Sequence, residues 1–394
     1  MKRCIIVKPE WRIIEGWAPA YAQAFQMLGY AVDLAENVGD LFKIISSAIS
    51  SDINSSFEFL LTFSGYGINE AAMGQFSFDI LGIPVVSLYI DHPENTPSRH
   101  NLSPVNSFSG LFDRGDIIYA RKYLESSTRY FFLTDAGLEY PGPLPGFYER
   151  DIDILFCGTI PDYNKNRACI EGMGRPNLLK FFDMLAYMLL HNEHLSPYDA
   201  LEAILENSGF RLLPGGAGST LIHVMISQVT HYVRGKRRIK LLNTLLDSGL
   251  KICCVGPPGH FHMFDNPNLQ ILDYAVHNAF GDGYLQLVRR AKVTINTSPL
   301  SQYAISERQP TSMLNGALVV SDMNPYMDLY FKDGRDLIAY SHEDYGHLPQ
   351  SISFVLGNRE KWEEMTYNAY NIAKTHHTFT CRAKEIIDVL HSGF

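Results

Sequence analysis

The chain has 394 residues, 46% of them hydrophobic and 19% charged, which is enough for two or three globular domains with large cores. Its formal net charge of −9 argues against a general nucleic-acid binder, because such proteins carry a basic face. No stretch reaches membrane-spanning length, and the apolar run near Met1 is too short for a signal peptide. We therefore expect a cytoplasmic protein without a transmembrane segment.

Short apolar strands alternate with helices in the first part of the chain, which is typical of parallel βαβ units. The expected strands are Cys4–Val7, Ala31–Leu34, Phe57–Phe63, Ile83–Ile90, Asp116–Tyr119 and Tyr130–Leu133. Ligands of such sheets lie beyond the carboxyl ends of the strands, and Asp91 and His92 stand at one of these ends. His92 is suited to proton transfer, with Asp91 orienting it or acting itself. The alternative is a plain turn before Pro93.

Pro141–Gly146 is dense in residues that fit neither helix nor strand interiors, and it separates two α/β segments. We expect one domain over residues 1–148 and a second over residues 149–375. Three predicted helices with almost no strand between them make residues 175–234 a helical insertion in the second domain. The expected last segment, residues 376–394, is helical.

Ser306–Asp322 predicts a short helix followed by a buried strand. Ser306 is suited to cap the helix, and Gly316 is suited to end it. The amino-terminal end of such a helix offers free backbone N–H groups and a positive dipole end, which suits a phosphate group.

One pattern in the chain has a known counterpart. It consists of Glu307 and Arg308, a short helix, and then Gly-Ala-Leu-Val-Val-Ser-Asp at 316–322. It resembles the C-terminal signature of the CgeB-like (spore maturation protein type) glycosyltransferases, which are related to the group 1 retaining sugar transferases of the GT-B fold. The similarity extends, in the same order, to Asp151–Thr159, Arg167, Tyr330–Gly334, Leu337–Tyr340, His377–Phe379 and Arg382–Ala383. The resemblance implies an α/β protein with two Rossmann-like parallel-sheet domains that face a cleft.

The resemblance also implies an acceptor-side first domain and a nucleotide-sugar-binding second domain, with the last helix packing back on the first. The expected reaction moves a sugar from a nucleotide diphosphate to an acceptor hydroxyl, with retention of configuration. Neither a metal nor a cofactor besides the donor is expected. Arg167 and Arg308 are the candidates for the diphosphate, because a guanidinium group matches phosphate oxygens in a fixed fork. The alternative is that both arginines form surface ion pairs.

Glu307 is a candidate to accept hydrogen bonds from sugar hydroxyls, or else it complements the helix dipole without a ligand. The backbone amides of Ser306–Gln309 and of Gly158–Thr159 would add donors to the diphosphate. Thr311 stands where many retaining relatives carry a second Glu that binds the ribose, and its hydroxyl would bind more weakly than a carboxylate. Position after strands adds the remaining candidates, which are Gly256, Asp273, Tyr274, Ser298 and Tyr303.

Two charged segments are weighed against simpler interpretations. The basic cluster Arg234–Lys240 is by default a solvated face, and the alternative is contact with a membrane surface or an anionic acceptor. Asp151 and Asp153 match the Asp-x-Asp motif of metal-dependent glycosyltransferases. In those enzymes the motif follows a strand, whereas here it lies at the start of one, so no metal site is expected.

Two other classes of function stay open. A nucleotide-sugar epimerase or NAD-dependent enzyme would need a Gly-x-Gly-x-x-Gly turn after the first strand, and Val7–Arg12 contains none. A non-catalytic partner protein that kept the fold would explain Thr311 at the place of a glutamate. The sequence leaves the sugar, the base, the acceptor and the oligomeric state open.

Overall fold

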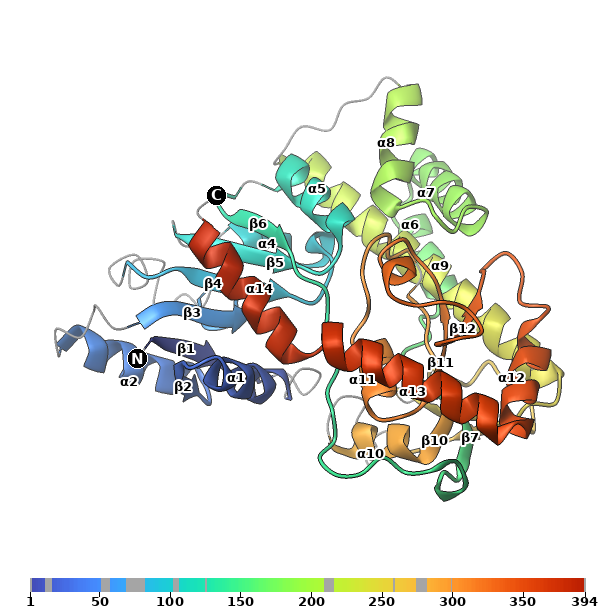
Figure 1. Ribbon diagram of the computed structural model, residues 1–394. Helices are drawn as coiled ribbons and strands as arrows, with labels where there is room; N and C mark the ends of the chain where they lie inside the picture. Colours follow the sequence, from blue (N-terminus) through green and yellow to red (C-terminus); the bar gives the residue numbers. More distant parts are fainter. Residues whose placement is uncertain are drawn as a thin grey trace. The chain divides into compact units, whose positions relative to one another are not determined.

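The protein is described by a computed structural model that covers ten ranges of the chain. These are residues 2–10, 16–50, 57–68, 82–101, 106–124, 126–208, 216–257, 259–273, 282–298 and 300–392. The chain divides into two compact units, each built on a six-stranded parallel sheet (Figure 1). Unit 1 comprises residues 1–135, 212–223 and 378–394, and unit 2 comprises residues 136–211 and 224–377. The predicted α/β architecture with two Rossmann-like sheets is confirmed.

The sheet of unit 1 has the strand order β2-β1-β3-β4-β5-β6. Its strands are β1 (Arg3–Val7), β2 (Ala31–Ala35), β3 (Phe57–Phe63), β4 (Val85–Tyr89), β5 (Ser107–Leu111) and β6 (Arg129–Phe132). Cys4, Ile5, Ile6 and Val7 of β1 are all fully buried. A run of apolar residues without alternation is typical of a parallel strand that is covered on both faces.

The helices of unit 1 cover this sheet and include the end of the chain. They are α1 (Trp17–Met27), α2 (Val38–Ser50), η3 (Pro93–Asn95), α4 (Pro97–Asn101), α5 (Arg114–Tyr123) and α14 (Phe379–Ser392). The ring of Phe379 at the start of α14 lies 6.0 Å from that of Trp17 and 4.9 Å from that of Tyr21, both in α1. These aromatic contacts hold the last helix of the chain in unit 1.

The prediction of a strand at Asp116–Tyr119 is wrong, because these residues lie in helix α5. Asp113 caps the helix, and its carboxylate accepts a hydrogen bond from the Gly115 amide at 2.7 Å. The strand of this region is β5, whose Ser-Phe-Ser-Gly-Leu sequence carries little β-propensity. Gly110 in β5 is packed between Leu88 and Phe131, so tertiary packing makes this segment a strand.

The sheet of unit 2 has the strand order β12-β11-β10-β7-β8-β9. Its strands are β7 (Ile152–Cys157), β8 (Ile252–Val255), β9 (Leu269–Ile271), β10 (Ala291–Ile295), β11 (Leu318–Asp322) and β12 (Ile338–Tyr340). The helices of unit 2 outside the connection from β7 to β8 are η4 (Phe147–Glu149), α10 (Asp282–Arg290), α11 (Arg308–Leu314), η5 (Met327–Leu329), α12 (Leu348–Gly357) and α13 (Arg359–His376). All pairings are parallel, so the carboxyl ends of these strands lie along one edge of the sheet.

Within the described residues, four helices lie between β7 and β8, where a Rossmann unit needs only one. They are α6 (Tyr163–Glu171), α7 (Pro176–Leu190), α8 (Pro197–Ser208) and α9 (Gly216–Asp247). Helix α9, yellow in Figure 1, runs for 32 residues, and the basic cluster Arg234–Lys240 lies inside it. Gly235 is required there, because a Cβ atom would stand 2.5 Å from the Pro161 carbonyl oxygen.

Within the described residues, no helix is both long and apolar enough to cross a membrane.

Candidate active site

The carboxyl edge of the unit 2 sheet brings together residues that lie far apart in the sequence. Gly158 and Thr159 follow β7, Gly256 follows β8, Ser298 lies beyond β10, and Asp322 ends β11. Ligands of parallel α/β sheets bind at this edge. The structure therefore places four predicted donor-side residues, Gly158, Thr159, Gly256 and Ser298, at this edge of the unit 2 sheet.

Two glycines at this edge are closely approached, Gly256 by the backbone and Gly158 by an arginine side chain. A Cβ atom on Gly256 would collide with the carbonyl oxygen of Gly158. A Cβ atom on Gly158 would stand 2.6 Å from Nη1 of Arg308. The Gly158 amide donates to the Val255 carbonyl at 2.9 Å and continues the sheet, so it does not serve as the predicted anion donor.

Two guanidinium groups converge on this glycine. Nη1 of Arg308 donates to the carbonyl oxygen of Cys157 at 2.7 Å. Arg238, from α9, donates from Nε to the Thr297 hydroxyl at 2.7 Å and from Nη1 to the Thr159 carbonyl at 2.5 Å. The recorded partners of both groups are neutral oxygens, so within the described residues no carboxylate forms an ion pair with either one.

The electrostatics of Arg238 reflect its burial beside other cations. Arg238 is 3% exposed. Its burial lowers the pKa of its guanidinium well below the ordinary value, and the positive charges of Arg308 and Arg234 lower it further. Tyr340 and Asp322 counteract this only in part. A phosphate anion at these groups would offset the repulsion between the cations.

Arg167 is not used as predicted. Its Nε and Nη2 atoms each lie 3.0 Å from the carboxylate of Asp183, and its Nη1 atom lies 3.7 Å from Glu171. The bond to Asp183 raises the pKa of Arg167, and the side chain is 37% exposed. The surface ion pair was the simpler interpretation of Arg167, and the structure favours it. Arg238 is the second guanidinium of the site instead.

Sequence reasoning missed Arg238 because it lies in a dense basic cluster. Its spacing from buried apolar residues of the same helix nevertheless indicates that its side chain is buried. Arg237 follows the buried Val233 by four residues and precedes the buried Leu241 by four. Arg238 likewise precedes the buried Leu242 by four. Arginines in register with an apolar helix face are buried, and buried charges need a reason.

Three other side chains of the basic cluster contact protein groups. Nζ of Lys236 lies 5.0 Å from the ring of Tyr163, and Nζ of Lys240 lies 5.3 Å from the ring of Tyr345. Arg237 donates from Nη2 to the carbonyl oxygen of Leu189 at 2.6 Å. The default prediction of a solvated basic face is wrong for the buried Arg237 and Arg238, whereas Lys240 is exposed, as that prediction expects.

Glu307 and Thr311 form a pair one helical turn apart. The Thr311 hydroxyl donates to Oε1 of Glu307 and accepts a hydrogen bond from the Leu138 amide at 2.9 Å. Thr311 is completely buried. Its hydroxyl thus holds Glu307 and the segment before the linker, so the predicted ribose contact of Thr311 is contradicted. Glu307 is 5% exposed and neighbours Arg308.

Ser306 and Gln309 bond to each other through two hydrogen bonds. The Ser306 amide donates to Oε1 of Gln309 at 2.8 Å, and the Gln309 amide donates to the Ser306 carbonyl at 3.0 Å. Gln309 also donates to the Ser321 hydroxyl at 2.7 Å, and Ser298 donates from its hydroxyl to that of Ser306 at 3.2 Å. These bonds use the Ser306 and Gln309 amides, two of the four that were predicted for the phosphate, and Glu307 instead of Ser306 is the N-cap residue.

A buried relay behind these residues was not predicted. Asp322 accepts from the Ser298 amide at 2.8 Å and bonds to Nε2 of His342 at 3.0 Å. Nδ1 of His342 lies 2.8 Å from the Tyr345 hydroxyl. Burial opposes ionisation of Asp322, but the bond to His342 keeps its pKa below the ordinary value. The relay fixes the loop that carries Ser298.

Three further residues were predicted to bind the donor from their positions after strands. The ring of Tyr303 packs against that of Tyr326 with centroids 5.3 Å apart. Asp273 is exposed and follows β9, the edge strand of the sheet. Tyr274 lies outside the described residues.

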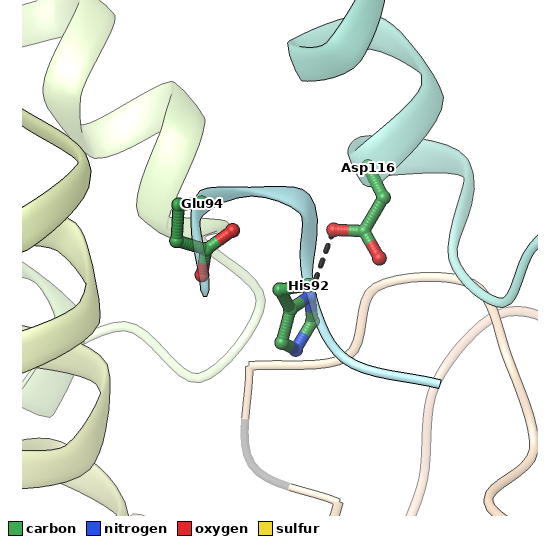
Figure 2. Close-up of side chains that lie close together, drawn as sticks. All are labelled: His92, Glu94 and Asp116. Atoms are coloured by element: carbon green, nitrogen blue, oxygen red, sulfur yellow. Dashed lines mark hydrogen bonds and ion pairs between the residues drawn. The ribbon is translucent and has the colours of Figure 1, made fainter. Parts of the chain in front are cut away.

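Unit 1 holds the predicted acceptor-side histidine with a different carboxylate. Asp91 is exposed, whereas Nδ1 of His92 lies 2.7 Å from Oδ1 of the buried Asp116 (Figure 2). Glu94 completes a cluster whose ligand-type atoms all lie within 4.8 Å of one another. Asp116 therefore takes the orienting place predicted for Asp91.

Comparison with known proteins gives the class of enzyme. Residues 237–388 match the model of a family described as "Glycosyl transferase-like". The matched region contains Arg238, Glu307, Arg308 and Asp322. No curated protein matches the chain. The family match confirms the prediction of a glycosyltransferase enzyme and favours it over the two other classes left open by the sequence.

Solved structures give the fold. A glycosyltransferase from Rickettsia africae ESF-5 has a TM-score of 0.51 at 8% identity, over 99% of this chain and 98% of that one. An α-glucosyltransferase in complex with UDP-glucose and DNA containing an abasic site has a TM-score of 0.53 at 14% identity, over 99% of each chain. An α-glucosyltransferase in complex with UDP and a 13-mer DNA has a TM-score of 0.52 at 12% identity, over 98% of this chain and 99% of that one. The chain has the GT-B fold of these enzymes.

Proposed function

We propose that this protein moves a sugar from a nucleotide diphosphate to an acceptor hydroxyl, and that Arg308 and Arg238 bind the diphosphate. The observation that carries the proposal is the convergence of two guanidinium groups on Gly158, with neutral oxygens as their hydrogen-bond partners. A planar guanidinium group is suited to phosphate oxygens. The absence of a side chain at Gly158 lets the guanidinium group of Arg308 lie against the end of β7.

The chemistry needs positive charge where the leaving phosphate develops negative charge. As the bond between the sugar C1 and the phosphate oxygen breaks, the bond between C1 and the acceptor oxygen forms. The acceptor proton passes to the leaving phosphate oxygen. Arg308 and Arg238 are fixed by their hydrogen bonds before the reaction, so they stabilise the departing charge without reorganisation.

We further propose that the reaction retains the anomeric configuration and needs no metal ion. Retention follows from the resemblance to CgeB-like and group 1 retaining enzymes. Two arginines supply the charge that a divalent cation would otherwise bring to a diphosphate. Glu307, buried next to Arg308, is the candidate for a sugar hydroxyl, and His92 is the candidate for the acceptor side.

The donor to try first is UDP-glucose. A structural neighbour was solved with that compound, and the fold is shared over nearly the whole chain. The DNA in that complex is not carried over as an acceptor, since the present chain has a net charge of −9. A cytoplasmic location remains a proposal from the sequence.

The test is transfer and hydrolysis of a panel of labelled UDP-, GDP- and TDP-sugars, followed by NMR of the product anomer. We expect one donor to be consumed, the configuration to be retained, and the rate to be unchanged in EDTA. Arg308→Ala and Arg238→Ala should lose most activity, whereas Arg167→Ala, at the surface ion pair, should keep it. Turnover that depends on a metal, or activity that survives both site variants, would contradict the proposal.

A further inference from the structure

We propose that Glu193 is a positioning residue for the proposed donor site around Arg308, and that it ties the helices inserted between β7 and β8 to this site. It fixes the loop after β12, and His342 and Asp322 of the relay extend this constraint to the loop that carries Ser298. The transmission along these hydrogen bonds stands on geometry within unit 2. Its effect on nucleotide binding rests on the proposed function.

Glu193 lies in the turn between α7 and α8, and both of its carboxylate oxygens accept hydrogen bonds from the loop after β12. The Ser341 hydroxyl donates to Oε1 at 2.8 Å, and the His342 amide donates to Oε2 at 2.6 Å. Hydrogen bonds to an ionised group are stronger than those between neutral groups. The Glu193 side chain is 17% exposed, whereas its neighbours Asn192 and His194 are exposed, so the turn directs this one side chain inward.

A second contact holds the inserted helices from the side of α9. The buried Arg237 donates from Nη2 to the carbonyl oxygen of Leu189, in the last turn of α7, at 2.6 Å. Burial lowers the pKa of Arg237, and the negative charges of Asp322 and Glu193 counteract this. The end of α7 and the turn after it are therefore held both from α9 and from the loop after β12.

The loop after β12 leads to the proposed donor site through three further hydrogen bonds. Nε2 of His342 lies 3.0 Å from Oδ2 of Asp322, and Oδ1 of Asp322 accepts from the Ser298 amide at 2.8 Å. The Ser298 hydroxyl donates to that of Ser306 at 3.2 Å, and Ser306 precedes Arg308 by two residues. The chain of hydrogen bonds thus begins at the inserted helices and ends just before α11.

His342 is the residue that passes the constraint on. A carboxylate only accepts, so His342 donates from Nε2 to Asp322, and in the neutral ring Nδ1 accepts from the Tyr345 hydroxyl, 2.8 Å away. The backbone amide of the same histidine donates to Glu193. Because one carboxylate holds the backbone of His342 and another holds its ring, a shift of this backbone changes the contact with Asp322.

A carboxylate is the group that suits both donors of the loop. A glutamine at position 193 offers one oxygen, and its NH₂ group would face the second donor. Glu193→Gln therefore loses one of the two hydrogen bonds while the length of the side chain is kept. Glu206→Gln is the matched control, because Glu206 is exposed in α8 of the same insertion.

The direct test is hydrogen exchange of the full chain, measured by mass spectrometry with fragmentation to single amides. In Glu193→Gln, we expect the amides of His342 and Ser298 both to exchange about tenfold faster or more than in the wild type. Glu206→Gln should exchange as the wild type does. Ser341→Ala removes one donor and should give the same pattern at a smaller size. Faster exchange of the His342 amide alone would show a local contact and overturn the proposal.

Nucleotide binding tests the consequence for the site. In Glu193→Gln, the Kd of the nucleoside diphosphate that binds the wild type should rise about three- to tenfold. The double variant Glu193→Gln/His342→Gln should bind no more weakly than His342→Gln, because both residues act along one chain of hydrogen bonds. Additive losses in the double variant would contradict transmission through His342.

Donor hydrolysis separates a positioning role from a loss of folded protein. KM for the donor should rise in Glu193→Gln, whereas a smaller folded fraction lowers only the apparent kcat. A lowered kcat with unchanged KM would assign Glu193 a purely structural role and overturn the proposal. If no nucleotide binds the wild type while the Ser298 amide exchanges faster as expected, the proposed function fails and the constraint from Glu193 stands.

Discussion

Arg308 donates from Nη1 to the carbonyl oxygen of Cys157 at 2.7 Å, and this bond lays the guanidinium group across the position where Gly158 would carry a side chain. The last residue of β7 and the first residue of α11 are thereby joined, although 151 positions separate them in the sequence. The missing Cβ of Gly158 is what lets a positive charge reach this edge of the sheet.

Replacing Gly158 with alanine should displace Arg308. The new Cβ would stand 2.6 Å from Nη1, so the guanidinium group would leave its bond to Cys157. We expect the affinity for a nucleoside diphosphate, measured by calorimetry, to fall about tenfold or more. Gly357→Ala is the matched control, because no atom lies within 4 Å of a Cβ there. Unchanged affinity in Gly158→Ala would count against the role of Arg308.

Arg238→Lys keeps the positive charge but loses the planar, forked arrangement of donors of the guanidinium group. A lysine cannot bond at once to the Thr297 hydroxyl and the Thr159 carbonyl as the guanidinium group does. A bond from the charged group to a phosphate oxygen contributes about 1.5–3 kcal/mol, so losing one such bond should lower donor affinity about 10- to 100-fold. Arg167→Lys, in an exposed ion pair, should leave donor affinity within about twofold. Equal losses of donor affinity in Arg238→Lys and Arg167→Lys would show that Arg238 does not bind the donor.

Thr311 is predicted to stabilise the fold and not to bind ribose. In Thr311→Val, Glu307 loses a hydrogen-bond donor and the Leu138 amide loses its acceptor. We expect the free energy of unfolding to fall by about 1–3 kcal/mol, whereas Thr311→Ser should keep most of it. Urea unfolding measures this difference. Nucleotide affinity should be similar in all three proteins, and a selective loss for ribose-containing ligands would restore the ribose role.

Asp322 predicts how stability responds to acid. Burial opposes its ionisation, but the bond from His342 keeps its pKa below the ordinary value of 3.8. A carboxyl group with a lowered folded pKa stabilises the protein above its unfolded pKa and loses that contribution as the pH falls through its folded pKa. Asp322→Asn should therefore be less stable than the wild type at pH 7, with a gap that narrows below about pH 4.

Urea unfolding of both proteins at several pH values measures that gap. His342→Ala should show the same trend, because it removes the bond that lowers the pKa. A gap that does not depend on pH would mean that the relay does not hold Asp322 ionised.

The sequence was sufficient for the parallel α/β architecture, because strands such as β1 and β11 are short apolar runs between helices. It also singled out Arg308, whose neighbours carry the family resemblance and whose side chain lies at the sheet edge. It failed at β5, where packing around Gly110 outweighs weak local propensity. The carboxylate partner of His92 was misassigned for the same reason, since Asp116 was placed in a strand that does not exist.

Arg167 and Arg238 show a second limit of sequence reasoning. Both precede β8, and only the fold decides which of them reaches the sheet edge. Asp183 pairs with Arg167 at the surface, while helix α9 carries Arg238 into the interior. Ion pairs between different helices depend on tertiary packing, which sequence position alone does not reveal.

The most direct test of diphosphate binding at Arg308 and Arg238 is titration calorimetry of UDP, GDP and TDP into the wild type and three variants. We predict that one nucleotide binds the wild type, that Arg308→Ala and Arg238→Ala weaken its binding about tenfold or more, and that Arg167→Ala does not. The corresponding nucleoside without phosphates should bind much more weakly. Undiminished binding of that nucleotide to both Arg308→Ala and Arg238→Ala would contradict the account.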